Sequence, residues 1–258
     1  MKVIVLSENT TNDPRLGAEH GLSLYLEACG KKILFDTGQG DLFAENAKTL
    51  GVDLAAVDFA VISHGHYDHG GGIRRFLQEN RTAPVWLNPH AFEPHFNAAG
   101  KDISLDPALL DDPRIRFAEE GTSPAPGITL YARADRPWLF PLQTGGLQQG
   151  TPDHLLPEDF RHEQYMLVEE DGRRVLFSGC SHRGILNIAA WFKPDVLIGG
   201  FHFFRLPLDD TLASYAARLD RTGIRFLTCH CTGVEQYEFL KPRMSRLEYL
   251  AAGDEVEI

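Results

Sequence analysis

Residues 60–72 read AVISHGHYDHGGG, an apolar run that passes directly into a cluster of metal-binding side chains and glycines. The apolar run predicts a strand that ends at a sheet edge. Zinc and similar divalent metals prefer imidazole nitrogen and carboxylate oxygen as ligands. Alternate residues of an extended segment share one face, so His64 and His66 can bind one ion. Asp68 and His69 follow at the bend and either face a second ion or complete the first, while the glycines let the backbone turn tightly.

The bulk composition is that of an ordinary globular protein. The chain has 258 residues, 43% of them hydrophobic, which is enough for a sizeable core. It has no run of about twenty apolar residues, so no membrane span is expected. The net charge of -11 argues against a nucleic-acid partner, because phosphate binding needs a basic surface. The first residues read as a strand rather than a targeting segment, and the cysteines show no disulfide pattern, so we expect a cytoplasmic location.

Hydrophobic patterning predicts strands and helices joined by loops rich in glycine and proline. Strands are expected at residues 3–7, 22–26, 31–35, 57–63, 84–87, 114–118, 128–132, 164–169, 173–178, 196–200 and 225–228, with a closing strand in the tail. Helices are expected at residues 41–50, 73–78, 185–192, 212–219 and 233–240. No linker marks a boundary, so residues 1–258 are expected to form a single domain of two halves with similar layout.

Three stretches carry more specific expectations. Residues 22–26 alternate between apolar and polar side chains, which predicts a half-buried strand. Residues 119–127 are expected to be a loop rich in proline and glycine. Residues 136–160 are expected to form a long loop, and their aromatic content favours a role in covering a substrate.

Histidines recur wherever a predicted strand is followed by a loop and a helix. The four places hold His64 to His69, His182, His202 and His230. Ligands collect at the strand ends of open α/β sheets, so these loops are expected to converge. We expect His182 and His230 to be metal ligands, whereas His202 either contacts substrate or binds metal. His20, His90 and His95 have no such context, and His154 and His162 remain open.

A family resemblance rests on these same motifs. The HxHxDH motif after an apolar strand, preceded by LFDTG at residues 34–38, resembles the metallo-β-lactamase-fold hydrolases. Four motifs narrow the resemblance to one branch of this superfamily. They are SHGHYDHGG at 63–71, GCSHRG at 179–184, GGFH at 199–202 and HCTG at 230–233. Together they resemble a branch named for dihydropterin-ribofuranosylaminobenzene phosphate synthase of methanopterin biosynthesis. The resemblance implies an α/β fold, a four-layer αββα sandwich with its metal site at the open edge of the two sheets.

The resemblance also assigns roles beside the central motif. Asp36 would be a structural carboxylate that holds the ligand loop. The superfamily's metal-bridging aspartate is replaced here by Cys180, so either Cys180 is a thiolate ligand or His182 substitutes from two residues on. We favour His182, because we expect it to be exposed beside the site. A mid-chain ligand histidine of the superfamily also lacks a clear counterpart, and His162 or His154 would fill its place.

The combined prediction is a metal-dependent hydrolase with two divalent ions, zinc by preference and iron or manganese as alternatives. The expected metal ligands are His64, His66, Asp68, His69, His182 and His230. A metal-bound hydroxide would attack a small anionic substrate, a phosphoester or a lactone, while Asp68 accepts a proton from the water. Arg183 is expected to contact an anionic group of the substrate, and His202 is a second candidate contact.

Two alternatives stay open. The branch name suggests a transferase that joins a pterin-methyl diphosphate to an aromatic ribosyl-amine phosphate, with Trp138, Phe140 and Phe201 stacking on the pterin. A non-catalytic metal or ligand sensor would need the same ligands without an open coordination position. The sequence does not distinguish a monomer from a homo-oligomer.

Overall fold

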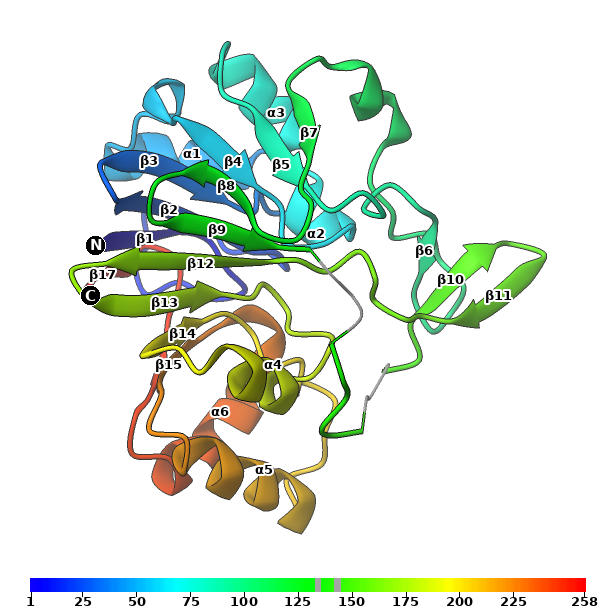
Figure 1. The fold of residues 1–258 in the computed structure, drawn as a ribbon, viewed down its shortest axis with the longest axis vertical. Coiled ribbons are helices and arrows are strands. Elements are labelled where there is room, and N and C mark those ends of the chain that lie inside the picture. The colour runs from blue at the N-terminus through cyan, green and yellow to red at the C-terminus, as the bar shows by residue number, and fades with distance from the viewer. Residues whose placement is uncertain (133–135, 142–144) are drawn as a thin grey trace.

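The computed structural model describes residues 1–132, 136–141 and 145–258, in which two sheets pack face to face with helices outside both (Figure 1). The first sheet runs in the spatial order β17 (Glu255–Glu257), β1 (Lys2–Ser7), β2 (Ser23–Ala28), β3 (Lys31–Phe35), β4 (Phe59–Val61), β5 (Val85–Leu87) and β7 (Ile115–Phe117). The second runs in the order β16 (Leu247–Tyr249), β15 (Arg225–Thr228), β14 (Val196–Ile198), β13 (Arg173–Phe177), β12 (Tyr165–Glu170), β9 (Ile128–Tyr131) and β8 (Thr122–Ala125). A small sheet of β11 (His154–Pro157), β10 (Gln148–Thr151) and β6 (His95–Phe96) projects to one side (Figure 1).

The helices cover the two outer faces. They are α1 (Leu42–Leu50), α2 (Tyr67–Gly70), α3 (Ile73–Glu79), α4 (Ile185–Phe192), α5 (Asp210–Asp220) and α6 (Val234–Leu240), with 3₁₀ turns at Leu54–Ala56, Pro107–Asp111, His230–Thr232 and Lys241–Arg243. Figure 1 shows α1 and α3 beside the first sheet and α4, α5 and α6 beside the second. The expected four-layer αββα sandwich is therefore confirmed.

Alternate residues of each strand supply different layers of the core, as the period of two requires. In β1, Val3 and Val5 point between the sheets, whereas Ile4 packs with the helices of the first sheet. In β13, Phe177 lies between the sheets and Leu176 packs against the helices of the second. Every strand in the middle of a sheet is thus apolar on both faces, which fixes the register and holds the strand ends rigidly.

Several expectations about local structure were wrong, each for a physical reason. Residues 23–26 are buried on both faces rather than half-buried, because helices cover the outer face of β2. The loop expected at 119–127 contains β8, which pairs antiparallel with β9. The loop expected at 136–160 contains the hairpin β10–β11, which turns at Pro152 and Asp153. Its strands lack apolar alternation, so hydrophobic patterning did not reveal them, although Pro-Asp is a turn signal.

Candidate metal centre

The candidate ligands leave from the carboxyl ends of parallel strands in both sheets. In the first sheet β3 leads to Asp36 and the parallel strand β4 leads to the loop of His64 and His66. In the second sheet β13, β14 and β15 are parallel and lead to the loops that carry the remaining predicted ligands, which are Cys180 and His182, His202, and His230. Because these ends share one edge of the sandwich, the predicted loops meet there.

A first group of donor atoms comes from His64, His66 and His182, which are all buried. The Nε2 atoms of His64 and His182 are 3.2 Å apart. Burial and the neighbouring imidazoles hold the pKa of His64 and of His182 well below the usual histidine range. Both rings are therefore neutral at physiological pH, which is the form that binds metals.

A second group is formed by Asp68, His69, Cys180 and His230. The Nε2 atom of His69 lies 3.1 Å from the Sγ of Cys180 and 3.2 Å from the Nε2 of His230. One carboxylate oxygen of Asp68 lies 3.4 Å from Nε2 of His230 and 3.8 Å from Nε2 of His69. Burial opposes ionisation of Asp68, but the facing imidazoles outweigh it and hold its pKa well below the usual range. Burial raises the pKa of the Cys180 thiol, and a bound metal would be needed to convert it to a thiolate.

Hydrogen bonds on the far side of the rings fix which nitrogen faces each group. Both oxygens of Asp36 accept from Ser63, one from the backbone N–H at 2.6 Å and one from the hydroxyl at 2.7 Å. The Oγ of Ser63 is thus left to accept from Nδ1 of His64, at 2.9 Å. Asp36 also lies 2.7 Å from Nδ1 of His69, and the side-chain oxygen of Asn9 lies 2.7 Å from Nδ1 of His230. In each of these three histidines Nδ1 donates to its outer partner and Nε2 faces the site, where a neutral ring offers a lone pair. Burial opposes the charged form of His69, but the carboxylates of Asp36 and Asp68 outweigh it and raise its pKa, so a metal would have to displace a proton from its Nε2.

The spacing of the donors fits metal coordination. Two nitrogens on one tetrahedral zinc, each about 2.0–2.1 Å from it, lie about 3.3 Å apart. The Nε2–Nε2 distances of 3.2 Å match this value in both groups. His64, His69 and Cys180 also place donor atoms within 4.8 Å of one another, so the two groups adjoin. The buried donor set therefore fits a divalent metal centre.

The expected choice between Cys180 and His182 does not arise, because the two residues belong to different groups. The exposure expected for this loop was wrong. Ser181, His182 and Arg183 are all buried, whereas the burial of Cys180 was expected. The guanidinium of Arg183 lies over the rings of Trp138 and Trp191, 5.1 Å and 5.8 Å from their centroids. Arg183 therefore packs against aromatic rings, and it does not line the cavity over the donor groups.

Three histidines without a clear sequence signal lie close to the site. His20 Nε2 is 3.3 Å from Asp68, and its ring contacts that of His230. His95 and His162 are buried in a cluster with His66 and Glu158. His162 is thus near the site, as the open expectation for it allowed, whereas His154 is exposed on β11. A loop position such as that of His20 gives no periodicity from which its approach to the site is predictable.

Backbone geometry marks the same place. Asp36, Ser181, His202 and His230 have φ between 48° and 60°, a left-handed conformation that non-glycine residues seldom adopt. All four lie at strand ends around the donor groups. Such strained residues gather at functional sites, where the surrounding structure holds them in place.

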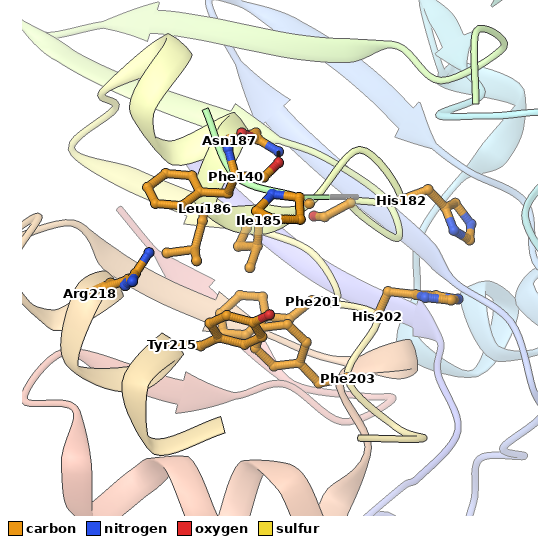
Figure 2. A pocket seen from close by; sticks show the side chains of 13 residues that line it. Phe140, His182, Ile185, Leu186, Asn187, Phe201, His202, Phe203, Tyr215 and Arg218 are labelled. Carbon is orange, nitrogen blue, oxygen red and sulfur yellow. Dashed lines mark hydrogen bonds between the residues drawn. The ribbon is translucent and has the colours of Figure 1, made fainter. Parts of the chain in front are cut away.

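Two cavities meet at His182 and His202. The first, of about 150 Å³, exposes the donor groups and is also lined by Tyr67, Asn97 and Arg205. The second, of about 70 Å³, is mainly apolar and is lined by residues such as Phe140, Phe201 and Phe203. Figure 2 shows this second cavity with His182 and His202 at one end and Arg218 at the other. His202 thus lies where a substrate contact was expected.

Among the described residues, no helix is both long and apolar enough to cross a membrane.

Comparison with known proteins identifies relatives along the whole chain. A synthase of Methanocaldococcus jannaschii, 7,8-dihydropterin-6-methyl-4-(beta-D-ribofuranosyl)-aminobenzene-5'-phosphate synthase, is 27% identical, with 98% of this chain and 95% of the relative covered.

Solved structures agree with this fold. A crystal structure described as a metal-dependent hydrolase of the β-lactamase superfamily has a TM-score of 0.84 and 28% identity, over 100% of this chain and 99% of the other. Zinc-bound PqqB from Methylobacterium extorquens has a TM-score of 0.59 at 12% identity, over 100% of both chains, and so shares the fold alone. The family described as the metallo-beta-lactamase superfamily matches residues 16–219. With this match across most of its length, the chain belongs to the metallo-β-lactamase superfamily.

Proposed function

We propose that this protein is a metal-dependent hydrolase with two divalent ions, by preference zinc, that acts on a small anionic substrate. The observation that carries the proposal is the convergence of buried donors on one cavity, with Nε2 atoms 3.2 Å apart in each of two adjoining groups. One ion would be held by His64, His66 and His182. The other would be held by Asp68, His69, His230 and Cys180.

A divalent metal in such a site lowers the pKa of a coordinated water and stabilises negative charge on a substrate. The chain's own residues supply the remaining requirements. Asp68 lines the cavity and is ionised, because its facing imidazoles favour the charged form, so it can accept a proton at Oδ2. The Nε2 atom of His20 lies 3.3 Å from the same oxygen and positions this carboxylate.

Arg205 takes the role that the sequence suggested for Arg183. It is exposed, it lines the cavity over the donor groups, and it carries positive charge in a chain of net charge -11. His202 lies on the same wall. A guanidinium binds phosphate or carboxylate in a fork, so a phosphoester substrate, or the carboxylate that forms when a lactone is hydrolysed, fits this position.

The relative from Methanocaldococcus favours a second function. By its name that protein is a synthase, so a transferase that joins a pterin-methyl diphosphate to an aromatic ribosyl-amine phosphate is the alternative. Phe140 and Phe201 line the smaller cavity, where an aromatic group of such a substrate would lie. A cytoplasmic location and the oligomeric state remain predictions from sequence.

Product analysis of the zinc-loaded protein separates these functions. Turnover of a simple phosphodiester or lactone supports the hydrolase, whereas inorganic diphosphate released only when both partners are present supports the transferase. Tight ligand binding without turnover would contradict both and support a sensor. His66→Ala and His230→Ala are each expected to lose metal and activity together, and His154→Ala, an exposed histidine, is the matched control. Full metal occupancy in both site variants would overturn the ligand assignment.

A further inference from the structure

A buried carboxylate lies behind the first donor group. The side chain of Glu158 has no exposure to solvent, and its nearest charged or titratable partners are three imidazoles. Its oxygens lie 2.5 Å from Nδ1 of His95, 2.8 Å from Nε2 of His162 and 3.4 Å from Nε2 of His66. None of these contacts meets the geometry of a hydrogen bond, and these ring nitrogens and carboxylate oxygens have no hydrogen-bond partner among the described residues. Burial of an uncompensated carboxylate is costly, so the three rings must stabilise it.

The protonation of His162 follows from the backbone. The N–H of Gly65 donates to Nδ1 of His162 at 2.8 Å, so Nδ1 has no proton. In a neutral imidazole the other nitrogen then carries the proton, and Nε2 of His162 donates to Glu158. Because that Nε2 has no free lone pair, His162 cannot also bind a metal through it.

The distances within the cluster of Glu158 and its three histidines also argue against a metal ion there. The four side chains place one donor atom each within 4.8 Å of one another, which by itself is compatible with a metal site. However, ligands on one zinc lie more than about 3 Å apart, and two of the contacts to Glu158 are 2.5 Å and 2.8 Å. These are the distances of direct contacts between a carboxylate and imidazole nitrogens, with no metal between them.

His66 connects this cluster to the metal centre. Its ring lies 4.6 Å from that of His64 and 4.9 Å from that of His182, the partners of the first donor group. Its Nε2 faces Glu158, so Nδ1 is the nitrogen left for the cavity that His66 lines. A histidine that binds metal through one nitrogen donates its other N–H to a carboxylate in most known sites.

We propose that Glu158 is a positioning residue, which accepts the Nε2 proton of His66 and thereby presents Nδ1 of that ring to the first metal. The inference rests on the proposed function. His95 and His162 hold the carboxylate in turn, since their rings stack 3.9 Å apart and both contact the same oxygen of Glu158.

The small sheet of β6, β10 and β11 positions the carboxylate of Glu158. Glu158 follows β11 directly, and its backbone N–H donates to the carbonyl of Leu147, the residue before β10. The strand β10 pairs with β6, which carries His95. The segment expected to be a substrate-covering loop thus brings an acid and a histidine together behind a candidate metal ligand.

The test compares Glu158→Gln with Asp159→Asn, the exposed neighbouring carboxylate. Both changes remove one negative charge, but only the first alters the contact with His66. Zinc affinity of the full chain is measured by competition with a chromophoric chelator, and the metal-free proteins are compared by thermal unfolding. We expect Glu158→Gln to lower the affinity for one of the two zinc ions about 10- to 100-fold and to leave the affinity for the other unchanged. Asp159→Asn should bind both as the wild type does.

A second readout reports on position directly. Two-bond ¹H–¹⁵N spectra of the protein labelled with ¹⁵N-histidine should show His66 and His162 protonated at Nε2 in the zinc-loaded wild type. In Glu158→Gln, the pattern of the Nε2-protonated tautomer of His66 should be absent or should appear together with that of the other tautomer. Equal zinc affinity in the two variants would overturn the role of Glu158 but would leave the proposed function standing. A third zinc equivalent that disappears in His162→Gln would overturn it in favour of a metal site at the cluster. A wild-type chain that binds no zinc would overturn the proposed function as well.

Discussion

Replacing Asp36 by asparagine tests how strongly a buried carboxylate organises the ligand loop. Asp36 accepts from the backbone and hydroxyl of Ser63 and lies 2.7 Å from Nδ1 of His69. Asparagine has the same shape and tolerates the left-handed backbone at this position, where φ is 60°. It keeps one acceptor oxygen for Ser63 but places an NH₂ group toward the hydroxyl and His69.

The magnitude follows from the hydrogen bonds that the substitution weakens. A hydrogen bond to a charged group contributes about 1.5–3 kcal/mol, and two of three are compromised, while the charge itself is no longer buried. We therefore expect the metal-free variant to lose about 2–4 kcal/mol of unfolding free energy. His69 can restore its hydrogen bond only by moving its proton to Nε2, which removes the lone pair from the second donor group. Zinc content should therefore fall by one equivalent.

Urea unfolding of the metal-free proteins and metal analysis of the zinc-loaded proteins provide the assay. Asp58→Asn is the matched control, because Asp58 also accepts from a backbone N–H, that of Lys32 at 2.8 Å, but is exposed. The control should lose less than about 1 kcal/mol. If Asp36→Asn were as stable as the control and kept its full zinc content, the reasoning about His69 would be refuted.

Four further outcomes are expected. Cys180→Ser should lose one zinc equivalent and, with cobalt in place of zinc, the sulfur charge-transfer absorption; unchanged metal content would exclude a thiolate ligand. Gly65→Ala should lose about 1–3 kcal/mol in urea unfolding, because its Cβ would clash with a backbone oxygen, whereas Gly40→Ala, with open space around it, should change little. Arg205→Ala should raise KM more than it lowers kcat, and equal effects on neutral and anionic substrates would contradict an anion contact. The metal-free protein should lose stability as the pH falls below 6.5 toward 3, since burial lowers the pKa of His162 to about 3 and the unfolded chain takes up its proton first; a flat profile between about pH 7 and pH 5 would contradict this.

Local sequence pattern predicted the strands and the convergence of the histidine loops, whereas the four layers of the fold were expected from the family resemblance. Apolar periodicity identifies strands such as β12 and β13, and ligands after parallel strands must meet at one edge. The helix expected at residues 185–192 coincides with α4, since an apolar stripe and a preceding glycine mark it clearly.

What could not be predicted depends on packing between distant segments. Nothing local to His20 or Glu158 indicates that either side chain reaches the site, because each is placed by loops or by the pairing of β10 with β6. The burial of Arg183 likewise depends on Trp138 and Trp191, which a pattern confined to one loop does not contain. Hydrophobic periodicity describes elements, whereas these positions are set by tertiary structure.

The placement of His230 has a consequence for how the protein matures. Its backbone N–H donates to Glu8, and its ring is held by Asn9, partners that are 222 and 221 residues away along the chain. The pairing of β1 with β17 likewise joins the two ends of the sequence. Contacts of such long range form late and slowly in folding. His64, His66 and His182 lie earlier in the sequence than His230, whose position depends on both the first and the last part of the chain. Closure of the second donor group is therefore expected to be among the last steps of folding.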